Sequence, residues 1–153
     1  MARSKLSVAD VADETSSGGY SLDAQVGFLM RVAMQRHTSI FTAKMIDGLT
    51  QTQFAALAKL YEVGPSSQNH LGRLIYLDAA TIKGVVDRLS IRGLVTALND
   101  PKDRRRRAVT LTDEGRRVTE TAMKVAARIT AQTLTPLTAT EQRMIATLLK
   151  KLG

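Results

Sequence analysis

A run of charge at residues 102–107, Lys-Asp-Arg-Arg-Arg-Arg, lies between two short segments that have the residue types of β-strands. The first segment begins at Leu94-Val95, and Asn99-Asp100-Pro101 follows it with turn chemistry. The second segment, 108–112, is β-branched and alternates in polarity. The pattern predicts a β-hairpin with a basic tip, and the helical segments on either side must be arranged around it.

Three helices are predicted directly before this hairpin. The first begins at Thr50, which has capping-box spacing, and ends at Gly64-Pro65. Ser66 or Ser67 can cap a short second helix, and Asp78 is a good N-cap for the third. The third helix has an apolar stripe with i, i+3, i+4, i+7 spacing, made by Ile82, Val85, Val86 and Leu89. The order helix, helix, turn, helix, hairpin is that of a winged helix-turn-helix.

Long helical segments flank this middle region. A helix is predicted from Leu22 to Ile46, and its apolar face is wider than a surface helix needs. Such a helix is usually buried between two bodies, which here could be a partner subunit and the rest of the chain. Two amphipathic helices, separated by Pro136, end the chain and have the pattern of interaction helices. Residues 1–19 are rich in small polar side chains and predict a flexible arm.

The charge balance indicates the kind of partner. The chain has 22 Lys and Arg against 14 Asp and Glu, which gives a net charge of +8 and a pI near 10.2. Residues 73–107 hold nine basic and four acidic side chains, so most of the surplus lies in the predicted helix-turn-helix and hairpin. A small basic protein is attracted to polyanions.

No apolar stretch reaches the roughly 18 residues of a membrane span, and the N-terminus lacks a signal-peptide core, so we expect a cytoplasmic protein.

Composition excludes several chemistries. The 153 residues contain no cysteine, which excludes a disulfide scaffold, a thiol nucleophile, a cysteine redox sensor and a thiolate zinc site. With two histidines, His37 and His70, a multi-histidine metal site in one chain is not expected. The sequence has no glycine-rich phosphate loop, HExxH motif or nucleophile elbow. We therefore expect a protein without enzymatic activity, cofactor or metal.

The predicted order of elements suits double-stranded DNA. A helix fits the major groove, which is about 12 Å wide, and can present side chains to base edges. A hairpin beside that helix can place an arginine in the narrow minor groove, where the potential is most negative.

Two runs of residues resemble the MarR family of bacterial transcription regulators. They are LGRLIYLDAATIKGVVDRLSIRGLV at 71–95 and NDPKDRRRRAVTLTDEG at 99–115, and the second is the more specific because it matches the family's wing. The resemblance covers about residues 22–152. It implies a mainly α fold with a small β-hairpin, in which residues 49–115 form a winged helix-turn-helix DNA-binding domain. Residues 20–48 and 116–153 would be helices of a dimerisation region.

The resemblance also implies a function. Family members are dimers that bind pseudo-palindromic DNA operators through two recognition helices, and they are usually repressors. A small molecule enters a cleft between the dimer helices and the DNA-binding lobe and releases the operator. The expected function is thus a ligand-responsive repressor that is nucleoid-associated when bound.

Several candidate DNA-binding residues lie on the predicted recognition helix. The forward exposed face, carried over from the family, is Ala80, Thr81, Lys83 and Gly84. Relatives often have Ser, Thr and Arg there, so Ala80 and Gly84 depart from the pattern. Lys83 and Thr81 are the best base-edge candidates, and Ala80 can touch a thymine methyl. Arg88, one turn further on, could reach a phosphate or instead form a salt bridge.

The other DNA-binding candidates lie in the preceding helix and in the wing. The start of the short second helix would bind phosphate through outward N–H groups, at Ser66, Ser67, Gln68 and Asn69; capping alone is the alternative. Asp103 and Arg105 match the family's Asp-x-Arg, in which the arginine enters the minor groove and the aspartate positions it. Additional attraction to phosphates would come from Arg104, Arg106 and Arg107.

The effector is predicted from the family and from the first long helix. Many relatives sense aromatic acids, and some sense their coenzyme A thioesters. The residues that could line such a cleft are Phe28, Met34, His37, Phe41, Met45, Phe54 and Tyr61. The cations that could receive a carboxylate or phosphates are Arg31, Arg36, Lys44 and Arg73. The alternative for the apolar stripe is an ordinary core.

A second function class uses the same basic wing. A constitutive architectural or RNA-binding winged-helix protein would need no effector, and it would bind any duplex with a steep salt dependence and little sequence preference. An enzyme acting on an anionic substrate would need a clustered base or nucleophile, which the sequence lacks. A protein-interaction adaptor has no need for four consecutive arginines.

Overall fold

The computed structural model describes residues 19–100 and 103–153, and the side chains of Asp100 and Arg104–Arg106 lie outside that description. Residues 1–18 of the predicted arm and Lys102 of the predicted tip are also outside it. The chain divides into two compact units, 1–35 and 36–153, with the boundary inside helix α1 (Val26–Lys44). Each unit is described by itself.

The first unit contains a 3₁₀ turn and the beginning of α1. The prediction of one continuous helix from Leu22 is wrong at its start, because the helix is broken at Gln25. Gln25 has extended backbone angles (φ −81°, ψ 127°) and ends a 3₁₀ helix at Leu22–Ala24. Apolar side chains of this unit are 44–61% exposed at Leu22, Val26, Leu29, Met30, Val32 and Met34.

In the second unit, α1 ends at Lys44 and a 3₁₀ helix at Ile46–Gly48 leads into α2 (Gln51–Val63). The predicted capping box of α2 is confirmed, since Thr50 Oγ1 accepts from Gln53 N at 3.2 Å and Gln53 Oε1 accepts from Thr50 N at 3.1 Å. Gly64 ends the helix with φ 79°, a value that glycine adopts without strain.

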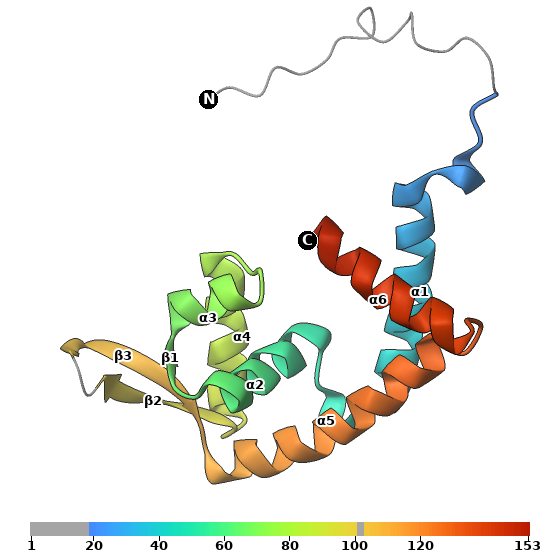
Figure 1. Ribbon diagram of the computed structural model, residues 1–153. Coiled ribbons are helices and arrows are strands. Elements are labelled where there is room, and N and C mark those ends of the chain that lie inside the picture. The colour runs from blue at the N-terminus through green and yellow to red at the C-terminus, as the bar shows by residue number, and fades with distance from the viewer. Residues whose placement is uncertain (1–18, 101–102) are drawn as a thin grey trace, which may run out of the picture. The chain divides into compact units, whose positions relative to one another are not determined.

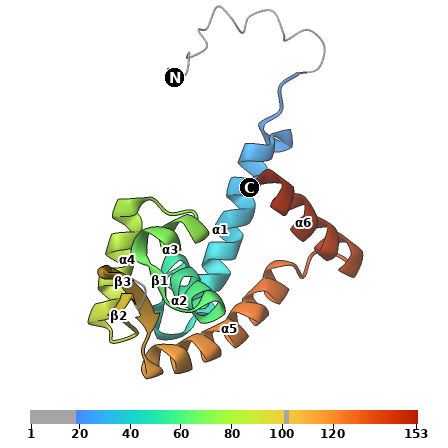
Figure 2. The same ribbon diagram turned by 60° about the vertical axis from the view of Figure 1, so that its left-hand side comes forward.

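The helix-turn-helix consists of α3 (Gln68–Leu74) and α4 (Ala79–Ile91), and α2 packs against both of them and against α5 (Figures 1 and 2). The predicted caps are confirmed: Ser67 accepts from His70 N, and Asp78 accepts from Thr81 N. The predicted stripe of α4 is buried. With Leu57 and Leu71, two residues of that stripe, Ile82 and Leu89, are among the largest fully buried side chains.

The sheet has three antiparallel strands in the order β1-β3-β2, with β1 at Ser66–Ser67, β2 at Val95–Asp100 and β3 at Asp103–Leu111. The predicted hairpin is confirmed as β2–β3, which projects beyond the helices in Figure 1. Strand β1 was not predicted. Its two serines have no alternating pattern, and they pair with Val109 and Ala108 because the fold brings them there.

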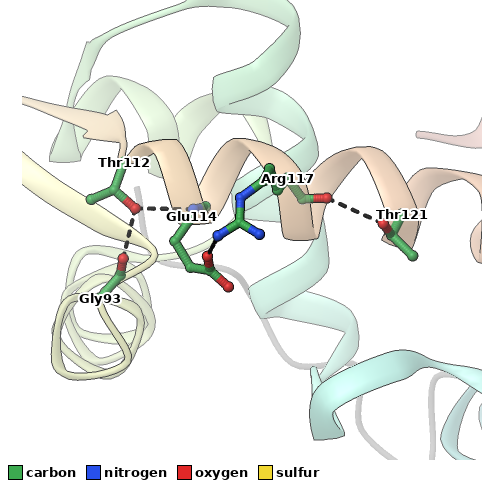
Figure 3. A network of polar contacts seen from close by, with 6 residues as sticks. Gly93, Thr112, Glu114, Arg117 and Thr121 are labelled. Atoms are coloured by element: carbon green, nitrogen blue, oxygen red, sulfur yellow. Dashed lines mark hydrogen bonds and ion pairs between the residues drawn. The ribbon is translucent and has the colours of Figure 1, made fainter.

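Helix α5 (Asp113–Thr133) begins directly after the hairpin and is anchored to it (Figure 3). Thr112 caps the helix by accepting from Gly115 N at 3.0 Å, and the same hydroxyl donates to Gly93 O at 2.6 Å. A Cβ on Gly115 would overlap the carbonyl oxygen of Leu94, so only glycine permits this approach. Glu114 and Arg117 form an ion pair on the exposed side.

Helix α6 (Ala139–Leu152) ends the fold and begins with a capping box between Thr138 and Glu141. No residue of α6 is buried. Its large apolar side chains at Met144, Leu148, Leu149 and Leu152 are 50–71% exposed.

The fold as a whole is mainly helical with one small sheet, which agrees with the predicted fold class. Among the described residues, no helix is long and apolar enough to cross a membrane.

Candidate DNA-binding interface

Helix α4 buries its apolar stripe in the core, so its opposite face lies at the surface. Ala80, Thr81 and Lys83 are exposed and Gly84 is half-buried, while the apolar stripe packs inward. Asp78 begins the helix by accepting the Thr81 N–H at 2.7 Å. This backbone hydrogen bond is the main reason that the pKa of the Asp78 carboxyl lies below its ordinary value of 3.8. The cap thus stays ionised at neutral pH and weakens only as the pH falls through that lowered pKa.

Two basic side chains of α4 are arranged along this face. Lys83 Nζ lies 2.7 Å from Asp87 Oδ2, and both side chains are more than half exposed. An exposed pair of this kind contributes little to stability, so separating Lys83 from Asp87 to contact another group costs little free energy. A Cβ on Gly84 would lie 3.4 Å from Arg88 Nη1. An added Cβ at position 84 would therefore meet the Arg88 guanidinium only at van der Waals contact distance.

The start of α3 is arranged differently from the prediction for Ser66. Ser66 is buried in β1, and its hydroxyl donates to Gly64 O at 3.3 Å. Its side chain is therefore not presented at the surface, because strand pairing with Val109 turns it inward. Ser67 is half-buried and serves as the N-cap, Gln68 is half-buried, and Asn69 is exposed.

The β2–β3 hairpin is the predicted wing, and its four arginines lie on strand β3. Asp103 pairs with Asp100 in the β2–β3 register, and Arg107, which is exposed, pairs with Asn99. The side chains of Arg104, Arg105 and Arg106 lie outside the described residues, although their backbone belongs to β3. The strand therefore continues into the predicted basic tip.

A cavity of about 160 Å³ lies in the second unit and collects part of the predicted effector residues. His37, Phe41 and Phe54 line it together with Gln51, Ala126, Ile129 and Thr130. The last four were missed, because they lie on α2 and α5 and nothing in their spacing relates them to α1. Phe41 also lines a neighbouring cavity of about 420 Å³ with Met45.

Other predicted effector residues lie elsewhere. Phe28, Arg31 and Met34 belong to the first unit, where the Arg31 guanidinium lies 5.2 Å from the Phe28 ring centre. Tyr61 donates to Glu120 Oε1 at 3.1 Å, and Arg116 lies over its ring, so it joins α2 to α5 outside both cavities.

The predicted cations do not line either cavity. Arg36 donates to Gln132 O at 3.0 Å and to Thr133 O at 3.4 Å, which ties α1 to the last turn of α5. Lys44 and Arg73 are exposed and absent from both linings. The polar side chains that line the smaller cavity are Gln51, Thr130 and His37. His37 Nδ1 lies 2.9 Å from Thr133 Oγ1.

Comparison with known proteins places this geometry in a family. The model of the MarR family matches residues 49–106. The HTH-type transcriptional repressor NicR of Pseudomonas putida is 41% identical over 134 residues, which cover 87% of this chain and 85% of NicR.

Solved structures extend the likeness to the fold. A probable transcriptional regulator from Pseudomonas aeruginosa is 47% identical, with a TM-score of 0.84 over 87% of this chain and 100% of that one. The Bordetella bronchiseptica protein BpsR, whose structure describes regulation of its DNA binding by 6-hydroxynicotinic acid, is 39% identical, with a TM-score of 0.83 over 88% of this chain and 97% of BpsR. The chain therefore belongs to the MarR family of winged helix-turn-helix transcription regulators.

Proposed function

We propose that this protein is a dimeric, ligand-responsive repressor that binds a pseudo-palindromic operator in the bacterial cytoplasm. The observation that carries the proposal is the exposed face at the N-terminal half of α4, with the basic β2–β3 hairpin in the same unit. A recognition helix reads base edges from its N-terminal residues. NicR, the relative described above, is a repressor.

On the DNA, each group has a distinct role. Thr81 and Lys83 contact base edges, Ala80 contacts a thymine methyl, and Gly84 allows close approach of the backbone. Arg88, Ser67, Gln68 and Asn69 contact phosphates. In the wing, Arg105 enters the minor groove beside Asp103, and Arg104, Arg106 and Arg107 attract the backbone. Ser66 is left out, because its hydroxyl is buried and already donates.

The dimerisation region comprises residues 20–48 and 116–153, flanking the DNA-binding domain at 49–115. Helix α6 supports this division, because all of its large apolar residues are at least partly exposed within one chain. The first unit also exposes apolar side chains along α1. A second copy of the chain would cover both surfaces and place two recognition helices about 34 Å apart, one helical turn of DNA.

The effector proposed for the smaller cavity is a one-ring aromatic acid. About 160 Å³ is close to the volume of an apolar cavity that accepts benzene, and a coenzyme A thioester would have to leave most of its atoms outside. Phe41 and Phe54 offer ring contacts, while His37, Gln51 and Thr130 offer hydrogen bonds. The relative BpsR responds to a one-ring acid, 6-hydroxynicotinic acid.

Occupation of this cavity would act through the helices that form it. Its walls come from α1, α2 and α5, and α2 also packs against the helix-turn-helix. A ligand that binds better to one arrangement of these helices shifts the protein toward it, and a change in the distance between recognition helices then weakens operator binding.

The function is tested by fluorescence anisotropy on the duplex upstream of the protein's own gene, beside a scrambled duplex of equal length. At about 150 mM salt we expect a preference of about 10³ or more for the upstream duplex. Equal binding to both, followed by failure of an unbiased site selection to enrich any sequence, would favour the constitutive architectural alternative.

The same assay tests the wing. Arg105→Ala is expected to weaken operator binding by about 1–3 kcal/mol while the dimer stays intact, because one minor-groove contact is lost. Wild-type affinity in this variant would contradict the placement of Arg105 in the groove.

The effector assignment is tested by operator release. 6-Hydroxynicotinic acid and other one-ring acids are expected to release the duplex, whereas benzoyl-coenzyme A is not. Ala126→Leu places a larger side chain at the cavity wall and should raise the required acid concentration about tenfold or more. Ala127→Leu, an exposed neighbour in the same helix, is the control. Release by the thioester alone would contradict the assignment.

A further inference from the structure

Tyr76, in the turn between α3 and α4, has an unusual backbone conformation. Its φ is 59°, and among the described residues the only other non-glycine with positive φ is Asp47. Aspartate tolerates the left-handed region because its short side chain can bond locally, but a bulky tyrosine is disfavoured there. Glycine would be the favoured residue at this position.

The turn itself explains why the backbone is held in this way. Leu77 N donates to Gly72 O at 2.9 Å and Tyr76 N donates to Arg73 O at 3.3 Å. Gly72 lies against Ile82, with only 3.0 Å between the methyl Cγ2 and the position that a Cβ would take. The two backbone bonds are those of a helix C-terminal turn, which places one residue in the left-handed region, and here that residue is Tyr76.

Within the part of the chain that the structure describes, the Tyr76 side chain makes no contact that would offset the free energy of the backbone strain. It is 87% exposed, the largest exposed fraction among the exposed large apolar residues. No hydrogen bond or ring contact of the phenol is present among the described residues. A strained, solvent-exposed aromatic residue thus occupies a position where glycine would serve the fold better, and such outliers point to a role outside the fold.

The position of Tyr76 indicates that role. It lies two residues before the N-cap Asp78, at the end of α4 that the proposed function directs into the major groove. We propose that the Tyr76 hydroxyl donates a hydrogen bond to a DNA phosphate at the edge of that groove. This inference rests on the proposed function. Because a phosphate carries no base identity, the contact strengthens binding to every duplex alike and positions the recognition helix.

The test compares Tyr76→Gly and Tyr76→Phe with the wild type. Tyr76→Gly relieves the backbone strain and should melt at or above the wild-type temperature, measured by circular dichroism. Both variants should bind the upstream duplex and a scrambled duplex about tenfold more weakly, the loss expected for one hydrogen bond to a charged group. The slope of affinity against salt should not change, since a neutral phenol releases no counterion.

Ile91→Ala is the matched control, because Ile91 is 86% exposed at the opposite end of α4 and should leave both affinities unchanged. Wild-type affinity in Tyr76→Gly would overturn the proposal, and so would wild-type affinity in Tyr76→Phe, which keeps the ring and the fold. Failure of the proposed function is distinguishable, because it would appear as loss of sequence preference in the wild type.

Discussion

Gly115→Ala is expected to lower the free energy of unfolding by about 3–5 kcal/mol, near the upper end for a single substitution. The added methyl would overlap the Leu94 carbonyl oxygen, which is backbone and cannot rotate away. The same carbonyl accepts from Thr112 N at 3.1 Å, so moving it breaks the junction between the hairpin and α5. Thr119, fully buried, donates to Gly115 O and would also move. Urea unfolding followed by circular dichroism at fixed protein concentration measures the loss.

Gly84→Ala is the matched control within another helix. Its Cβ meets only the far end of the Arg88 side chain, at 3.4 Å. Alanine is favoured over glycine in a helix by about 1 kcal/mol, so this variant should unfold at a higher urea concentration. A Gly115→Ala protein as stable as the wild type would show that α5 does not approach Leu94 as described.

Leu149→Lys is expected to shift the protein from dimer to monomer and to weaken operator binding at least about a hundredfold, because each recognition helix then binds one half-site alone. Leu149 is 51% exposed on the apolar face of α6, and the proposed dimer buries it. The lysine adds positive charge, which by itself would favour DNA, so a loss of affinity must come from assembly. Light scattering after size exclusion gives the mass, and anisotropy gives the affinity.

Thr147→Lys adds the same charge to the exposed opposite side of α6 and serves as the control. It should keep the wild-type mass and bind DNA at least as tightly. A Leu149→Lys protein that remains dimeric would place the dimer interface away from α6.

Most helix boundaries could be predicted because their causes are local. Thr50, Asp78, Thr112 and Thr138 each accept from a backbone N–H three residues further along the chain. A cap of this kind depends on one turn of chain, and therefore it is readable from residue type and spacing. The buried stripe of α4 and the β2–β3 hairpin were predicted for the same reason.

The effector residues could be predicted only in part. His37, Phe41 and Phe54 meet at one cavity, but Tyr61 contacts Glu120 and Arg36 binds the end of α5. Arg92, part of the basic surplus, donates to Asp47 O at 2.6 Å and thereby contributes to the fold. Charge and hydrophobicity identify what such side chains can do, but the partner they meet depends on packing.

The amino-acid sequence by itself determined the order of elements, the helix caps and the basic winged helix-turn-helix, because these follow from periodicity and from contacts within a few residues. The tertiary structure decided which residues share a cavity, that Ser66 joins a third strand, and that Tyr76 takes a left-handed conformation. Arg36 and Gln132 are 96 residues apart in the chain. Contacts across such separations arise only when helices pack, so they carry no local pattern in the sequence.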